Sequence, residues 1–213
     1  MRLRFNRFQL LVHLGSLLPL ALLITAALLD NLTVNPIQAV EQRTGQYAII
    51  WLLLSLSCTP LATLGFSPAL QVRRALGLYA FFYALLHFFT FAVLDYNLDI
   101  NLVLADFGQK SFILVGLTGL LLLIPLAVTS TQGWMKRLGK RWKQLHRLIY
   151  VVGVVVVVHY ILAVKADIGQ PLIYGAVLVV LLIMRLPAVR LRLKTQRPGW
   201  LSSVNRFLTR SLT

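Results

Sequence analysis

Acidic and basic residues alternate between the two ends of a series of long apolar runs. Six runs of about 20 residues, the length that crosses the hydrocarbon core of a bilayer, occupy 8–29, 46–65, 75–94, 110–129, 145–165 and 171–187. All six acidic residues fall in the first, third and fifth intervals: Asp30, Glu41, Asp95, Asp99, Asp106 and Asp167. All but three of the 21 Lys and Arg residues lie in or beside the second and fourth intervals and the termini. We therefore predict an all-α integral membrane protein, a bundle of six transmembrane helices.

The charge pattern also predicts an orientation. Basic residues concentrate in loops on the cytoplasmic side of a membrane, so both termini are expected in the cytoplasm. The loop with Arg73 and Arg74 and the loop over 136–143 are expected on that side as well. Anionic membrane lipid should attract these segments. The net charge of +15 then reports orientation and gives no reason to expect nucleic acid as a partner.

Two parts of the chain are expected. Residues 1–189 form the six-helix transmembrane domain, and residues 190–213 form a basic cytoplasmic tail. Apolar residues of the tail (Trp200, Leu201, Val204, Phe207 and Leu208), interspersed with Arg206 and Arg210, fit a short amphipathic helix on the inner membrane surface. A frayed tail fits equally well, and both alternatives stay open.

Two histidines fall at nearly equal depth in two different spans. At 1.5 Å per residue, His87 in the third span lies about 4 Å outward of the bilayer centre and His159 in the fifth span about 6 Å. That placement suits a flat metal macrocycle clamped between helices, with one neutral imidazole on each axial face. The alternative is that each is an isolated polar residue hydrogen-bonded to a neighbouring helix. A bare zinc site is disfavoured, because zinc takes three or four ligands and no carboxylate lies at this depth.

A second site is expected nearer the inner surface. His146 precedes His159 by about 20 Å of helix and is a candidate metal ligand there. The matching position of the third span holds Arg73, which is a poor metal ligand but a good partner for heme propionates. His13, in the first span, is the reserve ligand of this site, or a polar residue near a helix end.

Several motifs resemble the MsrQ (YedZ) family of heme-binding membrane subunits, which belongs to the ferric-reductase-like transmembrane superfamily. They are LGKRWKQLHRLIY over 138–150, HY at 159–160, RRxLG from 73 leading to LH at 86–87, TSTQ over 129–132, QPLIY over 170–174 and HxGxxxP from 13. The resemblance covers almost the whole chain. It implies heme b, one or two groups, held between the third and fifth helices. His87 and His159 would be the outer pair and His146 an inner ligand, while Arg73 stands where a second inner histidine might be expected.

The same resemblance implies a role in electron transfer, with no catalytic residue in this chain. Electrons would pass from the quinone pool or a cytosolic flavin reductase, across the bacterial inner membrane, to MsrP, a periplasmic molybdopterin enzyme that reduces methionine sulfoxide in oxidised proteins. FMN binding is attributed to the family. No GxGxxG-type nucleotide-binding fold is recognisable in this sequence, so pyridine nucleotide would be oxidised on another protein.

Two other functions compete with this reading. A transporter or proton-coupled carrier could use the histidines as protonatable sites. It would be favoured by broken helices, but Pro19 and Pro125 are the only prolines in mid-span and no acid accompanies them. A non-catalytic anchor for a partner protein would bind no heme and show no Soret band.

Overall fold

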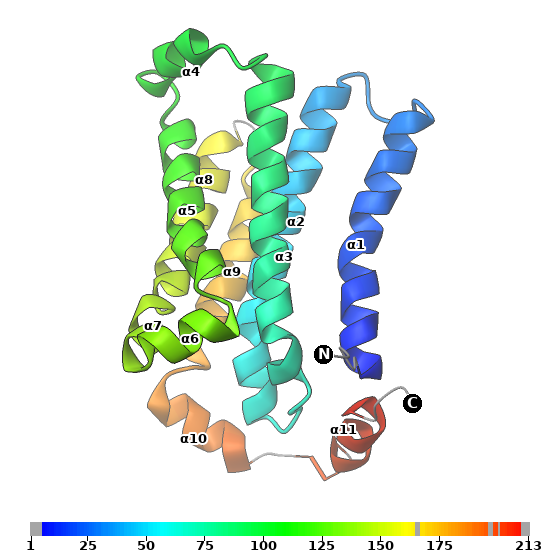
Figure 1. Ribbon diagram of the computed structural model, residues 1–213, viewed down its shortest axis with the longest axis vertical. Helices are drawn as coiled ribbons and strands as arrows, with labels where there is room; N and C mark the ends of the chain where they lie inside the picture. Colours follow the sequence, from blue (N-terminus) through cyan, green and yellow to red (C-terminus); the bar gives the residue numbers. More distant parts are fainter. Residues whose placement is uncertain (1–5, 165–166, 196–197, 200, 210–213) are drawn as a thin grey trace.

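The computed structural model describes residues 6–164, 167–195, 198–199 and 201–209, and these residues form helices and connecting loops. The long helices stand side by side as a bundle, and the start of the first helix and the last described helix lie near the same end (Figure 1). The helices are α1 (Arg7–Leu28), α2 (Pro36–Thr63), α3 (Ala69–Phe89), the π-helix η1 (Thr90–Asp95), α4 (Ile100–Phe107), α5 (Ser111–Val128), α6 (Gln132–Leu138), α7 (Lys140–Leu145), α8 (Leu148–Ala163), α9 (Gly169–Ile183), α10 (Pro187–Thr195) and α11 (Leu201–Thr209). The prediction of a helical, multi-pass membrane protein is confirmed.

Local sequence sets where several of these helices begin. Asn6 caps α1 in a reciprocal capping box with Gln9. Asn35 accepts a hydrogen bond from the backbone N–H of Gln38, and Pro36 supplies the fixed φ angle that suits a first helical turn. Asp99 and Thr131 cap α4 and α6 in the same way.

Five helices are long and apolar enough to cross a membrane: α1, α2, α3 with η1, α5, and α7 with α8. The sixth predicted span, 171–187, corresponds to α9, which has only 15 residues. It is followed after a short break by α10, bent away by 80°, and the pair makes a sixth span only when both are taken together. In Figure 1, α10 runs across the base of the bundle, and it contacts α2.

Several helix boundaries differ from the sequence prediction. The prediction of a loop over 136–143 was wrong, because these residues belong to α6 and α7 apart from Gly139. Helix α2 begins ten residues before the predicted start at 46. Helix α3 begins at Ala69, so the prediction that Arg73 and Arg74 lie in a loop was wrong. Both arginines belong to the early turns of α3, because the helix continues beyond the apolar run that defined the predicted span. Each extra segment mixes charged and polar residues with apolar ones, so it does not extend the apolar run.

Helix α2 is the centre of the packing. It contacts α3 most extensively, and α5 packs mainly on α8. One face of α2 places Ile49, Leu53 and Leu56 against Leu178 and Leu181 of α9. Leu52 joins a second cluster with Ala80, Leu123, Leu126 and Val152, and Cys58 a third with Ala69, Val72 and Leu76. Helix α1 lies at the edge and exposes most of its large apolar side chains, as expected for a surface that meets lipid.

The tail does form a helix within the described residues. Helix α11 returns to α1, where the Arg7 guanidinium lies 5.1 Å from the centre of the Phe207 ring. Asn205 donates a hydrogen bond of 2.8 Å to the carbonyl of Gly65. Trp200, Arg210 and the side chain of Arg206 lie outside the described residues. Placement of α11 on the membrane surface stays a prediction.

Candidate functional site

His87 on α3 and His159 on α8 face each other across the bundle. Their ring centroids are 6.1 Å apart and the ring planes are inclined by 73°. The two residues are 72 positions apart in sequence, and they meet because α3 and α8 run in the same direction and carry histidine at the same height. The structure thus brings together the two side chains that depth counting had paired.

Each imidazole is oriented by a backbone carbonyl. Nδ1 of His87 lies 2.9 Å from the carbonyl oxygen of Glu41, and Nδ1 of His159 lies 2.8 Å from that of Phe112. A carbonyl oxygen can only accept, so Nδ1 carries the hydrogen in both rings. Nε2 is therefore left with its lone pair. This tautomer, fixed by a carbonyl, is the one that metal-binding histidines use.

Glycines make these two hydrogen bonds sterically accessible. A Cβ at Gly45 would lie 3.2 Å from Cε1 and Nδ1 of His87, and a Cβ at Gly116 only 2.6 Å from Cε1 of His159. In both cases the glycine follows the accepting carbonyl by four residues on the neighbouring helix. The absent side chain lets the imidazole lie against that helix and reach the carbonyl. Sequence reasoning missed both glycines, because Gly45 fell just before the predicted second span and nothing in the sequence marked Gly116 as a contact.

Both histidines line a cavity of about 390 Å³ in the acidic half of the bundle. Gly45, Gly116 and the aromatic residues Phe88, Phe91, Phe107 and Phe112 also line it. The walls come from α2, α3, α5 and α8, with η1 and α4 closing the acidic end. Its surface is largely apolar, as is typical of small-molecule and cofactor sites.

The pair fits the axial positions of one metal centre. Two imidazole nitrogens on opposite sides of a metal are each about 2 Å from it, and the ring centres lie about 1 Å farther back on each side, giving about 6 Å. The observed 6.1 Å matches that separation. Two neutral nitrogens suit iron in a macrocycle, which supplies its remaining ligands. Among the described residues, no group of three or more His, Cys, Asp and Glu side chains could hold a bare metal ion.

His146 lies apart from this cavity, between α7 and α8. Its ring stacks on Trp142 with centroids 4.0 Å apart, and its Nε2 lies 3.1 Å from Oγ1 of Thr129. The Thr129 hydroxyl gives its hydrogen to the carbonyl of Pro125, so it accepts from His146 Nε2–H. Trp142 in turn donates to the carbonyl of Thr129. The histidine is therefore held in a small hydrogen-bonded cluster at the basic end.

Arg73 and His13 also lie away from the histidine pair. Nδ1 of His13 is 2.9 Å from the hydroxyl of Tyr79, which joins α1 to α3. Arg73 lines a different cavity, at the basic end, together with Arg185 and Arg190. Of the five residues predicted to bind cofactor, His87 and His159 thus face each other. The other three, His146, Arg73 and His13, lie elsewhere in the bundle.

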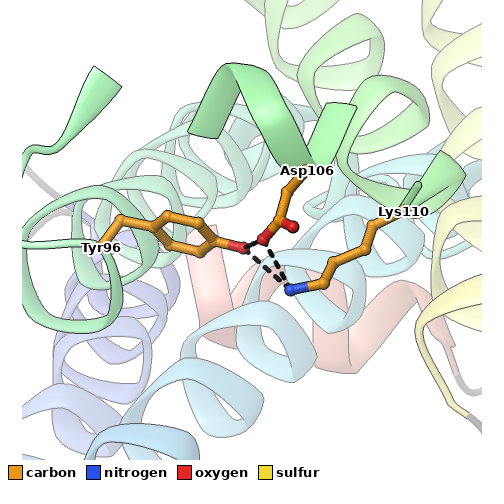
Figure 2. Close-up of polar contacts among 3 residues, drawn as sticks. All are labelled: Tyr96, Asp106 and Lys110. Carbon is orange, nitrogen blue, oxygen red and sulfur yellow. Dashed lines mark hydrogen bonds and ion pairs between the residues drawn. The ribbon is translucent and has the colours of Figure 1, made fainter. Parts of the chain in front are cut away.

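The acidic end carries a polar cluster that sequence reasoning did not identify. Figure 2 shows Tyr96, Asp106 and Lys110 pointing toward one another. Lys110 Nζ lies 2.7 Å from Oδ2 of Asp106 and 3.1 Å from the Tyr96 hydroxyl, which donates to the same carboxylate. The hydrogen bond from Lys110, and then that from Tyr96, holds the pKa of Asp106 below its usual value, while Asp106 raises the pKa of Lys110. This cluster fastens α4 to the start of α5.

The long helices form a membrane-spanning bundle, and two facing imidazoles line a cavity inside it together with two glycines. These features define the class of protein: a membrane protein with a paired-histidine site. Comparison with known proteins agrees. Residues 44–164 match the family model described as the ferric reductase like transmembrane component. A Rhodospirillum rubrum protein named protein-methionine-sulfoxide reductase heme-binding subunit MsrQ is 44% identical over 194 residues, 90% of this chain and 93% of that protein. Proteins of the same name from Herminiimonas arsenicoxydans and Bordetella pertussis are 44% and 40% identical, over 82% and 86% of this chain and 82% and 90% of their own lengths.

The chain therefore belongs to the ferric reductase-like transmembrane family and, within it, to the MsrQ family of heme-binding subunits. The family model covers His87, His146 and His159 and ends at Val164. It leaves out His13 and the tail.

Proposed function

We propose that this protein is a transmembrane b-type cytochrome that holds heme between His87 and His159. The observation that carries the proposal is the pair of imidazole rings with centroids 6.1 Å apart. In each ring Nδ1 donates a hydrogen bond to a backbone carbonyl, and Nε2 keeps a lone pair that can bind iron. Heme bound there would carry one electron at a time. The chain's own residues set the orientation of both rings, exclude water with apolar walls and keep both imidazoles neutral.

The direction of transfer follows from charge and from the relatives. With the basic end in the cytoplasm, the histidine pair lies nearer the periplasmic face of a bacterial inner membrane. The names of the relatives describe heme-binding subunits of a protein-methionine-sulfoxide reductase. The proposed acceptor is accordingly a periplasmic MsrP-like molybdopterin subunit that repairs oxidised proteins. The proposed donor is the quinone pool or a cytosolic flavin reductase at the basic end. FMN as a second cofactor rests on family resemblance alone.

We extend the proposal to an inner heme bound by His146, with Arg73 as a partner of its propionates and His13 in reserve. In the structure Nε2 of His146 is bonded to Thr129, so ligation would require that bond to be exchanged for iron. The inner site therefore has weaker geometric support than the outer pair. Counting the heme iron tests it directly.

No observation favours the transporter alternative. A proton carrier needs imidazole protons that exchange along a path, whereas both Nδ1 protons are held by backbone carbonyls. The one strongly bent helix pair among the described residues, α9 and α10, breaks at the basic end and contains neither His87 nor His159.

Optical and electron paramagnetic resonance spectra of the purified protein test the proposal. His87→Ala and His159→Ala should each abolish the low-spin signature of the outer heme, because each removes one axial ligand. His13→Ala, remote from the cavity, should keep it. Unchanged spectra in both cavity variants would refute the proposal, and wild-type protein without a Soret band would point to the anchor.

A further inference from the structure

A second cavity opens at the basic end of the bundle and is lined by three guanidinium groups. It has a volume of about 250 Å³ and lies where the last turn of α2 meets the first turns of α3 and α8 and the break between α9 and α10. Arg73 comes from α3, Arg185 from the break and Arg190 from α10. Tyr150 and Thr59 add hydroxyl groups to the wall.

Among the residues that the structure describes, no acidic side chain neutralises these three charges. All six Asp and Glu side chains belong to the opposite end of the bundle. The one ion pair among the described residues, between Asp106 and Lys110, also lies at that end. Three positive charges around one partly closed space repel one another. An anion bound between them would attract all three and make the net electrostatic interaction favourable.

Arg185 is held in place for such a ligand. Its Nη1 donates to the Tyr150 hydroxyl over 2.7 Å and its Nη2 to the carbonyl of Leu56 over 2.5 Å. Its Nε–H is buried and has no acceptor among the described residues. Since the Tyr150 oxygen accepts from Arg185, the hydrogen of that hydroxyl remains available for a further acceptor. A rigid guanidinium with a spare donor is suited to phosphate oxygens.

The cavity lies at the level expected for lipid headgroups. Helix α10 turns away from α9 by 80° and crosses the base of the bundle, as a segment does when it leaves a membrane and follows its surface (Figure 1). Arg185 lies within this turn and Arg190 on the crossing helix. Basic pockets between transmembrane helices at this level are suited to lipid headgroups.

We propose that this basic-end cavity binds the phosphodiester of an anionic phospholipid. The three guanidinium groups would contact the phosphate, and the chains of the lipid would lie against the bundle. A zwitterionic lipid offers the same phosphate but brings an ammonium group that the arginines repel. The bound lipid would join α10 to α2, α3 and α8. This inference concerns a site separate from the histidine pair and does not depend on the outer heme. Arg73 would serve this phosphate in place of the inner-heme propionate proposed above.

Native mass spectrometry of the full-length, delipidated protein tests the proposal. The protein is titrated with phosphatidylglycerol, with phosphatidylcholine of the same chains and with inorganic phosphate. We expect phosphatidylglycerol to bind about tenfold more tightly than phosphatidylcholine, and inorganic phosphate at equal concentration not to displace it. The double variant Arg73→Gln/Arg190→Gln should lose about tenfold in affinity for phosphatidylglycerol. It keeps Arg185 and therefore the hydrogen bonds that join α9 to α2 and α8.

The matched control is Arg137→Gln/Arg192→Gln, which removes two charges from the same end outside the cavity and should keep the affinity. Four results would overturn the proposal. Equal binding of the two lipids would show no selection for the anion, and displacement by inorganic phosphate would indicate a soluble ligand. An equal loss in the control would indicate general surface attraction. Loss of heme iron with lipid binding intact would assign the arginines to a cofactor. If the double variant does not fold, the wild-type titrations decide between these results.

Discussion

The imidazole of His159 lies against Gly116, where an added Cβ would come within 2.6 Å of ring carbon Cε1. Real Cβ atoms essentially never approach another heavy atom so closely, so the ring must move if that position gains a methyl group. The ring cannot move away from α5 and still keep its 2.8 Å contact with the Phe112 carbonyl. Gly116 is thus part of what fixes the position of the His159 imidazole, although it has no side chain.

Replacing Gly116 with alanine should therefore weaken heme binding. Overpacking typically costs about 1–3 kcal/mol, which corresponds to a loss of about 5- to 150-fold in affinity. The measurement is the ratio of Soret to protein absorbance, together with the low-spin resonance signal. Gly119→Ala on the same helix is the control, since a Cβ there would meet Val155 at an ordinary 3.5 Å. Equal heme content in the two variants would contradict this role of Gly116.

The inner site gives a second prediction. If His146 binds iron, His146→Ala should remove a second, spectroscopically separable heme, while Arg73→Ala should mainly shift its potential, because a guanidinium partners propionates and does not normally ligate iron. Iron and heme are quantified per protein in each variant. Thr129→Val provides the control, since it removes the hydrogen bonds of the hydroxyl to His146 Nε2 and to the Pro125 carbonyl but leaves the imidazole in place. One heme in the wild type, with no loss in His146→Ala, would leave His146 a structural residue between α7 and α8.

We propose that the acidic end is the docking surface for the electron acceptor. The choice of variant for testing this depends on which acidic side chains also stabilise the fold. Neutralising Asp95, Asp99 and Asp106 together would also remove the cap of α4 and the ion pair with Lys110. Asp30→Asn, Asp95→Asn and Asp167→Asn in one variant remove three charges while keeping the side-chain oxygens. We expect reoxidation of reduced heme by an MsrP-like partner to slow by about tenfold or more at low salt, and the difference to shrink as salt rises.

Heme reduction from the basic end should be unaffected in that triple variant. Stopped-flow absorbance measures both steps. Asp106→Asn alone is the comparison, because the Asp106 charge is already paired with Lys110 and should matter less to a partner. Equal reoxidation rates at low salt would exclude these carboxylates from docking, and slower reduction would indicate the opposite orientation in the membrane.

The Tyr96–Asp106–Lys110 cluster predicts a pH window for α4. The folded pKa of Asp106 is lowered, so its stabilising contribution is present above the ordinary value of 3.8 and is lost as pH falls through the folded pKa. The pKa of Lys110 is raised, so its contribution is present below the ordinary 10.5 and is lost as pH rises through the folded pKa. Burial, and then the bond to Asp106, raises the pKa of Tyr96, which acts in the same direction as Lys110. Helix α4 should be most firmly held between about pH 4 and pH 10.

A spin label attached to the Leu102→Cys variant, at an exposed position on α4, measures how firmly α4 is held at each pH. Its mobility should rise below and above the window. The rise should be absent in Asp106→Asn/Lys110→Gln, whose α4 should be mobile at every pH. A pH-independent label in the parent protein would show that the cluster does not hold α4.

The sequence predicted the height of the two histidines but not what surrounds them. Counting residues along a regular helix gives depth, because the rise per residue is constant, and two helices running in the same direction preserve it. The rotation of one helix against another depends on side-chain packing. For this reason Gly45 and Gly116 carried no recognisable signal.

Helix ends were harder to predict than helix centres. Apolar runs mark the hydrocarbon core, whereas α2 and α3 extend beyond it through polar turns that include Glu41 and Arg73. Such extensions are stabilised by caps and tertiary contacts, for example the bond from Ser55 to the Arg73 carbonyl. The 80° bend after α9 falls just before Pro187, the first residue of α10, and Arg185 within the break donates hydrogen bonds to Tyr150 and to the Leu56 carbonyl.

The π-helix η1 begins three residues after His87 and ends where the acidic loop starts. A π turn accommodates one more residue than an α turn, so it can absorb an insertion without rotating the helix that precedes it. The segment from Tyr96 to Lys110 is thereby insulated from His87 on α3. Over evolutionary time this surface can change its length and sequence while His87 and His159 stay in register.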